Sequence, residues 1–225
     1  MNDSKHLWLS LRAGLTHYDV RLGTATAQGY VGDPRMVAFV ASRYKFCAKM
    51  LEGMGSVVEI GCGDAFGSPI VAQSVGALTC TDIDEETLVD NRERCRFFPN
   101  MSFKYHDFRA HPFSPKADAV YLVDVIEHVF PEEMPAFMTN LAASVREHGI
   151  VLIGTPNKTS EQYASENSKI GDVNVMTGKD LRAACARYFH NVFMFGMNDE
   201  VVHTGYLPMA HYLWALCVAP FGKRD

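Results

Sequence analysis

The chain has 225 residues, of which 21 are Lys or Arg and 26 are Asp or Glu, so its formal net charge is -5. This length suits one domain with a full hydrophobic core. A content of 48% hydrophobic and 21% charged residues is ordinary for a soluble globular protein. The sequence has no cluster of Lys and Arg of the kind that nucleic-acid-binding proteins use to contact phosphates. We therefore expect no nucleic acid among its partners.

Membrane and secretory features are also missing from the sequence. No stretch approaches 18 apolar residues, and the first residues lack the uncharged run of a signal peptide. Six cysteines are scattered without CxxC pairs or zinc-ligand spacing, at positions 47, 62, 80, 95, 185 and 217. Buried free thiols in a reducing compartment fit this pattern better than disulfides. We expect a cytoplasmic protein with no membrane partner.

Strand-like and helix-like segments alternate along most of the chain. Five apolar runs predict strands: Ser56–Ile60, Leu78–Asp82, Ser102–His106, Ala119–Val123 and Ile150–Gly154. Two more strand-like runs, Asn191–Phe195 and Tyr212–Val218, follow near the C-terminus and are joined by a long segment, 196–211. This alternation predicts an α/β domain with a doubly wound, mostly parallel sheet.

The helices between these strands have recognisable start signals. One begins near Pro69, since proline suits a first helical turn, and one follows Asp84, which has the features of an N-cap. A third helix is predicted over Glu132–Glu147, with Gly149 after it, and a fourth runs from a capping box at Thr177 to about Tyr188. We expect a single domain, 1–225, with an N-terminal helical arm over 1–51 and an α/β core over 52–225.

A glycine-rich turn follows the first predicted strand. Glu59 lies near the end of that strand, and Gly61 and Gly63 let the backbone turn sharply and approach a ligand closely. Asp82 stands about 20 residues later, at the tip of the second strand, where a carboxylate can accept hydrogen bonds from both ribose hydroxyls. The pattern predicts a site for an adenosine-bearing cofactor.

The spacing of the glycines indicates which cofactor. A dinucleotide fingerprint needs a third glycine where Phe66 stands, and this side chain would crowd the helix end that holds a pyrophosphate. The alternative pattern acid-x-Gly-x-Gly is met by Glu59, Gly61 and Gly63. Here the chain resembles the class I S-adenosylmethionine-dependent methyltransferases. It departs from their motif at Ala65, which replaces a glycine.

The resemblance covers roughly residues 53–219 and implies seven strands, the last pair forming an antiparallel hairpin. It implies S-adenosylmethionine as cofactor and S-adenosylhomocysteine as product. It also implies roles: Asp82 holds the ribose, Ile83 packs on adenine, and Asp107, beside Phe108, accepts from the adenine amino group. The full set of expected cofactor residues is Glu59, Gly61, Cys62, Gly63, Asp82, Ile83, Asp107, Phe108 and Asp124.

Candidate catalytic residues follow the fourth strand. If a helical turn begins at Asp124, then Asp124, Glu127 and His128 share one face at i, i+3 and i+4. The segment resembles the Glu-His signature of small-molecule methyltransferases, including quinone-biosynthesis O-methyltransferases. His128 is the expected general base, assisted by Asp124 and Glu127. Two alternatives stay open: the same groups hold a divalent cation such as Mg²⁺, or they anchor a turn through hydrogen bonds.

Further segments are candidates for the acceptor pocket. Many relatives carry a histidine where Asp172 stands, so Asp172 is an alternative base or hydrogen-bond acceptor. The segment 197–206 is rich in polar and aromatic groups that suit a polar acceptor. In the N-terminal arm, Arg21 and Tyr30 are further candidate contacts.

These observations predict a methyltransferase that O-methylates a small polar acceptor, such as a sugar or another small metabolite. The alternatives are an N- or C-methyltransferase acting on a small molecule, a non-catalytic cofactor-binding subunit that supports a partner, and a nicotinamide-dependent oxidoreductase. A homodimer is left open, as is the requirement for a metal.

Overall fold

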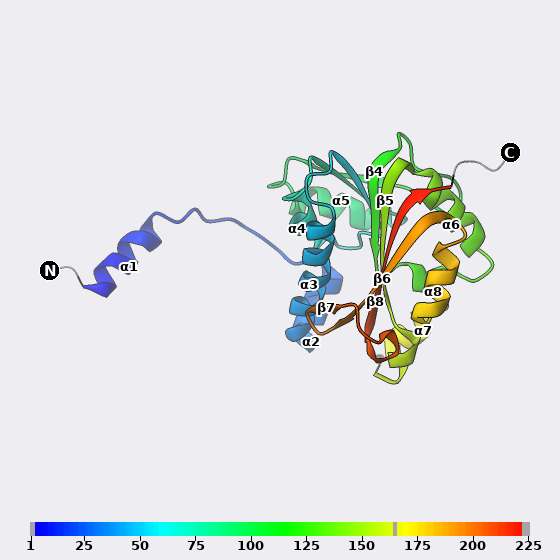
Figure 1. Ribbon diagram of the computed structural model, residues 1–225. Coiled ribbons are helices and arrows are strands. Elements are labelled where there is room, and N and C mark those ends of the chain that lie inside the picture. The colour runs from blue at the N-terminus through cyan, green and yellow to red at the C-terminus, as the bar shows by residue number, and fades with distance from the viewer. Residues whose placement is uncertain (1–2, 164–165, 222–225) are drawn as a thin grey trace.

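The computed structural model describes residues 3–163 and 166–221. Its centre is one eight-stranded mixed sheet with the strand order β3-β2-β1-β4-β5-β8-β6-β7 (Figure 1). The strands are β1 (Ser56–Ile60), β2 (Ala77–Asp82), β3 (Met101–Tyr105), β4 (Ala117–Val123), β5 (Val145–Pro156), β6 (Phe189–Asn198), β7 (Val201–His203) and β8 (Tyr212–Pro220). Strands β1 to β5 are parallel, and β8, β6 and β7 add antiparallel pairs. The predicted fold class is confirmed.

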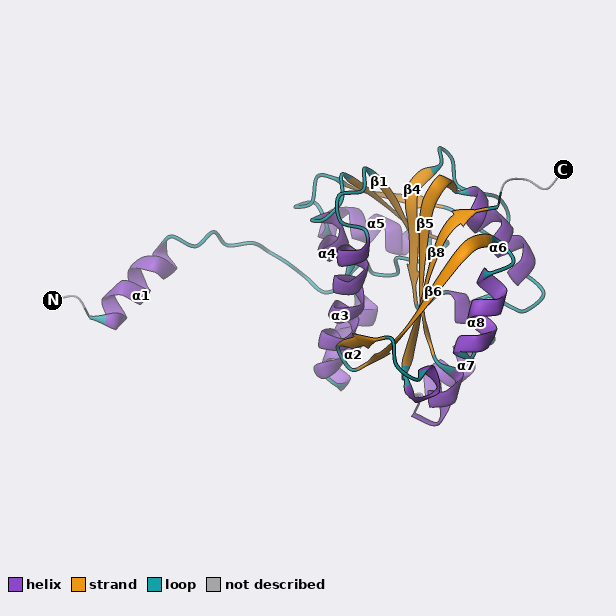
Figure 2. Ribbon diagram, viewed as in Figure 1, coloured by secondary structure: helices purple, strands orange, loops and turns teal. Residues whose placement is uncertain are grey.

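Helices cover both faces of this sheet, and α1 stands apart from it (Figure 2). The helices are α1 (Ser4–Ala13), α2 (Thr24–Gly32), α3 (Arg35–Met50), α4 (Ser68–Ala72), α5 (Glu85–Arg94), α6 (Met134–Ala143), α7 (Glu166–Gly171) and α8 (Gly178–Cys185), with short 3-10 turns η1 (Ile126–His128), η2 (Lys158–Tyr163) and η3 (Leu207–Met209). Among the described residues, no helix combines the length and apolar character needed to cross a membrane. The last four residues of the predicted core, 222–225, lie outside the described residues.

Strand β4 shows how the two layers are built. Successive side chains of a strand point to opposite faces, so Val120 and Leu122 pack with α6 and α8 in one core cluster. Ala119, Tyr121 and Val123 pack with α3 and α4 in the other. Because both faces are buried, the strand is a nearly continuous apolar run, as expected for the centre of a parallel sheet.

Three residues that were predicted to start helices do so in the structure. Pro69 stands in the first turn of α4. The Asp84 carboxylate accepts hydrogen bonds from the backbone N–H groups of Glu86 and Thr87 at the start of α5. Thr177 caps α8, where its hydroxyl accepts from the N–H of Asp180 and donates to that residue's carboxylate.

The helix predicted over Glu132–Glu147 is too long at both ends, because α6 ends at Ala143 and β5 begins at Val145. A tertiary contact explains the early end. Ser144 is fully buried; its hydroxyl accepts from the Phe113 N–H and its carbonyl accepts from the Ala117 N–H, both at 2.9 Å. These bonds draw the chain into the sheet. Gly149 therefore lies inside β5, rather than at a helix end.

The expected count of seven strands is low by one. Within the segment 196–211, β7 pairs antiparallel with the end of β6, from Asn198↔Val201 to Gly196↔His203. Asp199 closes the turn with φ +50°, a left-handed conformation that aspartate tolerates better than most residues. The hairpin of β6 and β8 that the resemblance implied is present beside it.

Candidate active site

The glycine turn has the left-handed geometry that its sequence predicts. Gly61 has φ +66° and Gly63 has φ +49°, conformations that cost an L-residue about 1–2 kcal/mol. A Cβ on Gly61 would stand 2.5 Å from Cγ2 of Val125, whereas a Cβ on Gly63 would meet open space. Gly61 is therefore required by packing against the β4 turn, and Gly63 by backbone conformation.

Asp82 is held against this turn by backbone groups. Its Oδ2 accepts a hydrogen bond from the Gly63 N–H at 2.9 Å, and its Oδ1 accepts from the Asp84 N–H at 3.0 Å. The next residue, Ile83, leaves its apolar side chain 56% exposed at the rim. A carboxylate and an apolar surface lie side by side, as a ribose and an adenine require.

The departure at Ala65 leaves the turn intact. Ala65 is buried with φ +52°, and its N–H donates to the Cys62 carbonyl at 2.8 Å. The neighbouring Asp64 accepts hydrogen bonds from the N–H and the hydroxyl of Thr26, at 2.7 and 2.8 Å. Asp64 thereby caps the first turn of α2 and ties the N-terminal arm to the glycine turn, a link that sequence reasoning missed.

Two further residues of the motif are buried. Glu59 is 1% exposed, and the side chains of Ser68, Tyr44, Cys80 and Tyr121 surround its carboxylate. Burial raises the pKa of Glu59, which favours its protonated form. The Cys62 thiol is buried beside Asn91, whose amide donates to the Gly63 carbonyl at 2.7 Å. Both residues support the turn from inside.

A cavity of about 120 Å³ joins the glycine turn to the predicted adenine residues. It is lined by Ile60, Gly61, Asp82, Ile83, His106, Asp107, Phe108, Arg109, Val125, His128, Val129 and Phe137. This is smaller than the roughly 300–1,000 Å³ of a complete ligand pocket, so it accommodates one part of a cofactor. The structure thus brings five of the predicted cofactor residues to one cavity.

At this cavity the Asp107 carboxylate forms an ion pair with Arg109. The carboxylate accepts from the Arg109 side chain at 2.9 and 3.0 Å, and these hydrogen bonds lower the pKa of Asp107. Phe108 is 2% exposed and packs its ring with those of Phe113 and Phe137. Asp107 is therefore ionised and able to accept a hydrogen bond, while Phe108 forms the cavity's apolar floor.

Asp124 does not belong to the helical turn that was expected to include it. The turn η1 begins at Ile126, and Asp124 has φ +56°. Its carboxylate is directed to Arg43 of α3, whose guanidinium donates to Oδ2 at 2.5 Å and lies 4.1 Å from the centre of the Tyr212 ring. Burial is the largest single influence and lowers the pKa of Arg43, but the charge and hydrogen bond of Asp124, together with Tyr212 and Glu127, outweigh it and the net shift is upward.

The other two predicted catalytic residues, Glu127 and His128, differ in exposure. Glu127 is 1% exposed and accepts from the Thr155 hydroxyl at 3.0 Å. Burial, and then the Asp124 charge, raise the pKa of Glu127 well above its ordinary value, which favours its protonated form. The His128 side chain is half exposed and lines the cavity.

Asp172 joins this group from 44 residues further along the chain. His128 Nδ1 lies 2.9 Å from the Gly171 carbonyl oxygen and 3.5 Å from Asp172 Oδ1. Burial raises the pKa of Asp172. Glu127, His128 and Asp172 each offer one ligand atom, and these three atoms lie within 4.8 Å of one another. The set is therefore suited to a divalent cation as well as to proton transfer.

A second cavity, of about 130 Å³, is lined by Arg43, the partner of Asp124. It is also lined by Phe39, Met197, Asp199, His211 and Tyr212. Arg43 and Tyr212 were not predicted, and no local pattern could have indicated them, because only the packing of α3 on β8 brings them to Asp124. A larger hollow of about 1,210 Å³ between α8, β6 and η3 is lined by other residues.

The comparisons with known proteins agree with this geometry. Residues 57–149, which include the glycine turn and the segment from Asp124 to His128, match a family model described as a methyltransferase domain. A probable S-adenosylmethionine-dependent methyltransferase of Mycolicibacterium smegmatis is 27% identical over 103 residues, which cover 45% of this chain and 38% of that protein. The ubiquinone biosynthesis O-methyltransferase of Rhizobium etli is 29% identical over 147 residues, 62% of this chain and 57% of that protein.

The chain therefore spans about two fifths of the length of the mycobacterial relative and under three fifths of the other. Among solved structures, the N-methyltransferase NodS from Bradyrhizobium japonicum WM9 in complex with S-adenosyl-L-homocysteine superposes with a TM-score of 0.61. Its sequence is 12% identical, and the superposition covers 80% of this chain and 86% of that one. At this identity the likeness shows a shared fold.

Proposed function

We propose that the chain is a class I S-adenosylmethionine-dependent methyltransferase that transfers the cofactor's methyl group to a hydroxyl of a small polar acceptor. A sugar or a similar metabolite is the leading candidate. The net charge of -5 supports a small molecule over a nucleic acid. The match of residues 57–149 to a methyltransferase family model, together with Phe66 at the position of a third glycine, favours S-adenosylmethionine over a nicotinamide cofactor.

The observation that carries this proposal is the position of His128. A carbonyl oxygen can only accept a hydrogen bond, so the 2.9 Å contact with Gly171 requires a proton on Nδ1. In the neutral ring Nε2 then has a free lone pair. His128 lines the same cavity as Gly61 and Asp82, which supports a base beside a cofactor bound there.

S-adenosylmethionine, held by Gly61, Gly63 and Asp82, would supply the methyl group to the acceptor oxygen and leave as S-adenosylhomocysteine. The acceptor hydroxyl would lose its proton to Nε2 of His128. Asp172, 3.5 Å from Nδ1, stabilises the resulting imidazolium. Much of the acceleration comes from holding the two reactants in line.

Asp124 and Glu127 have supporting roles in this proposal. Asp124 is oriented by Arg43, and we expect its carboxylate to meet the cofactor's amino-acid end. The raised pKa of the buried Glu127 favours its neutral form, which limits negative charge beside Asp124.

The test is calorimetric titration with S-adenosylhomocysteine, followed by methyl transfer from labelled S-adenosylmethionine to a panel of hydroxylated sugars and small phenols. His128→Ala is expected to bind S-adenosylhomocysteine like the wild type and to lose about 10²–10⁴-fold in turnover. The exposed His148 provides a control, and His148→Ala should change neither quantity. Retained turnover in His128→Ala would remove the base assignment. Cofactor binding without transfer to any acceptor would favour the non-catalytic subunit.

A divalent cation is a second mechanism, supported by the close grouping of Glu127, His128 and Asp172. In that case the imidazole is a ligand, and the cation lowers the pKa of the acceptor hydroxyl. Calorimetric titration with Mn²⁺ separates the two mechanisms. Binding that Asp172→Asn abolishes, together with turnover lost in a chelator and restored by the cation, would assign the metal role. Turnover unaffected by the chelator supports the base.

A further inference from the structure

The first part of the N-terminal arm is an apolar helix that lies away from the rest of the molecule. Every residue from 3 to 22 is exposed, and in Figure 1 the extended segment after α1 leaves the body on the side of α2 and α3 that faces away from β6. Leu7 is 64% exposed, Trp8 60% and Leu11 59%. An isolated helix of ten residues is marginal in water, so α1 needs a surface to cover it.

The apolar residues of α1 occupy one side of the helix. At 100° per residue, Leu7, Leu11 and Trp8 span an arc of about 100°, and Leu9 falls roughly opposite to its centre. Arg12 and Lys5 follow next around the helix, beside Trp8. The helix thus presents an apolar stripe with a basic border.

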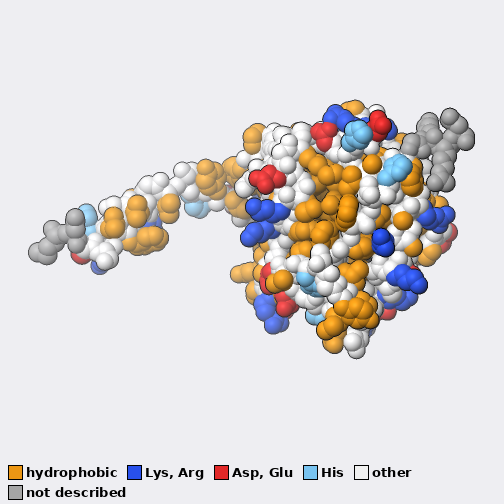
Figure 3. All heavy atoms as spheres, in the orientation of Figure 1, with side chains coloured by type: hydrophobic (Ala, Val, Ile, Leu, Met, Phe, Trp, Pro, Cys, Tyr) orange, Lys and Arg blue, Asp and Glu red, His pale blue; other side chains and the backbone are white. Residues whose placement is uncertain are grey.

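The body of the chain has an apolar surface of matching character, the β6–β8 patch, formed by Ile150, Phe193, Phe195, Leu216 and Val218. The strand registers place these residues on one face, since Phe193 pairs with Leu216 and Ile150 pairs with Val218. Phe193 is 53% exposed and the other four are partly exposed. Figure 3 shows hydrophobic side chains gathered over this region, between α3 and β6.

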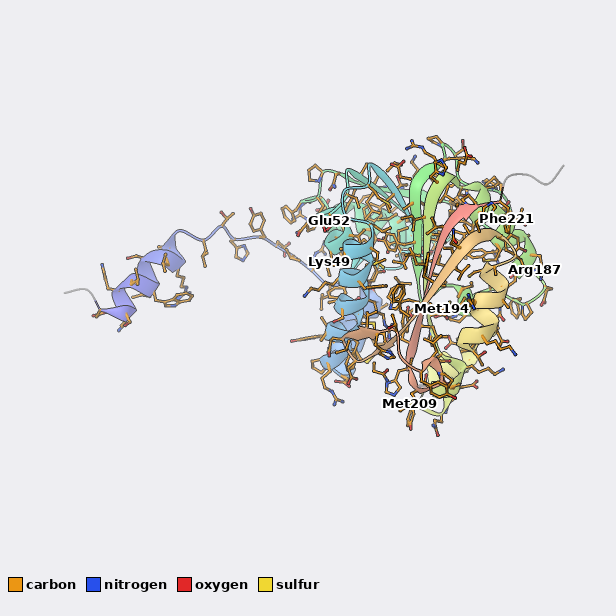
Figure 4. All side chains as sticks on the ribbon, in the orientation of Figure 1. Lys49, Glu52, Arg187, Met194, Met209 and Phe221 are labelled. Atoms are coloured by element: carbon orange, nitrogen blue, oxygen red, sulfur yellow. The ribbon has the colours of Figure 1, made fainter. Side chains whose placement is uncertain are left out.

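The patch adjoins an open sheet edge. Strand β7 pairs only with Gly196–Asn198, so among the described residues the earlier part of β6 has β8 as its single strand neighbour. In Figure 4 Lys49 and Glu52, at the end of α3, border the region on one side, and Met194 marks β6 on the other. An open edge beside exposed aromatic residues is a surface that proteins normally cover.

Charge favours a partner that resembles this body. Residues 4–18 contain Lys5 and Arg12 and no acidic residue, so all 26 acidic residues, against 19 basic ones, lie in the rest of the chain. A basic helix is attracted to such a body, whereas an anionic lipid surface would attract the helix but repel the acidic body. The helix's own patch lies beyond α3 from the base of the arm (Figure 1). A second copy offers the same patch without that obstacle.

We propose that two copies of this chain exchange their α1 helices, each apolar stripe covering the β6–β8 patch of the other copy. A single ten-residue helix buries less than the roughly 1,200 Å² of a stable interface, and reciprocal exchange under two-fold symmetry doubles the covered area. Residues 15–22, about 25 Å when extended, span the gap between the copies. The exchange is independent of the methyl transfer proposed above.

The test is sedimentation velocity of the full chain over a range of concentrations, with three variants. Leu11→Ser on the stripe and Phe193→Ser on the patch are each expected to raise the dimer dissociation constant at least 30-fold. Leu9→Ser, on the opposite side of α1 and 47% exposed, is the matched control and should change it less than threefold. A mixture of Leu11→Ser and Phe193→Ser chains should regain part of the affinity, because one intact stripe then meets one intact patch.

Trp8 gives an independent readout, because the other tryptophan, Trp214, is fully buried. Acrylamide quenching of fluorescence should fall as the dimer forms. A wild-type monomer at every concentration would overturn the proposal, as would a dimer that survives both variants. Shielding of Trp8 in a monomer would show instead that α1 docks on its own body. Leu11-dependent binding to phosphatidylglycerol vesicles without dimerisation would assign α1 to a lipid surface.

Discussion

The candidate site has two parts, the proposed cofactor half and the proposed catalytic half, and they are built in opposite ways. Around Gly61, Gly63 and Asp82 the geometry is made by backbone groups of two adjacent parallel strands. Around Asp124 and His128 it is made by side chains from separate segments, including Arg43 and Asp172. A geometry made by the backbone depends little on side-chain identity, whereas one assembled from side chains changes with each substitution.

Substitutions of its two glycines should destabilise the proposed cofactor half most strongly. In Gly61→Ala the added Cβ would stand 2.5 Å from Val125 and the residue would keep a left-handed φ. We expect a loss of about 2–5 kcal/mol in the free energy of unfolding, from overpacking plus strain. Gly63→Ala adds only strain, about 1–2 kcal/mol. Urea unfolding of both variants measures the difference.

Calorimetry with S-adenosylhomocysteine completes that comparison. The open space beside Gly63 is where a cofactor can approach the backbone. Gly63→Ala should therefore weaken binding more than its small stability loss suggests. Equal stability losses in the two variants would mean that Val125 moves aside, and that packing does not dictate the first glycine.

Substitutions of Asp82 test whether cofactor binding needs the carboxylate itself or only the turn that it holds. Asp82→Ala removes the acceptor of two backbone N–H groups, from Gly63 and Asp84, and we expect S-adenosylhomocysteine to bind about 10–100-fold more weakly. Asp82→Asn retains one oxygen and should lie between the variant and the wild type. Unchanged calorimetric affinity in Asp82→Ala would show that the ribose is held elsewhere.

Arg43 tests the catalytic half. Its side chain is 20% exposed and that of Asp124 is 34% exposed, so the pair is only partly shielded. Arg43→Met leaves Asp124 uncompensated, and we expect about 1–2 kcal/mol less stability in urea, after allowance for solvent screening. The control is Arg35→Met, in a surface pair with Asp33, which should have no measurable effect. Equal losses of stability in Arg43→Met and Arg35→Met would mean that the Arg43–Asp124 pair contributes no more than a surface ion pair.

Glu127 gives the smallest expected effect, seen as a pH dependence. Its folded-state pKa is raised, so the stabilising contribution of the protonated form is present below the ordinary pKa and is lost as pH rises through the folded value. Glu127→Gln stays neutral and should become more stable than the wild type as pH increases. Unfolding free energies from pH 4 to 9 measure this difference, with the exposed Glu147→Gln as control. A pH-independent difference would contradict burial as the cause.

Most of the fold could be predicted because its signals are local. Apolar runs located the central strands, and the caps at Asp84 and Thr177 located two helix starts. The errors arose where tertiary contacts override local preference. Hydrogen bonds from the N–H groups of Phe113 and Ala117 to Ser144 end α6. Strand β7 forms by antiparallel pairing with the end of β6.

The cofactor turn lies within a short stretch of chain, so spacing and glycine chemistry alone determined its backbone geometry and the position of Asp82. The catalytic half depends on distances that no short pattern encodes. The same reasoning placed Asp124 on one helical face with Glu127 and His128, and that was wrong because Asp124 takes a left-handed conformation before the turn. Only the packed structure decided that Arg43 meets Asp124 and that Asp172 meets His128, because side chains far apart in sequence become neighbours only when the sheet and its helices are assembled.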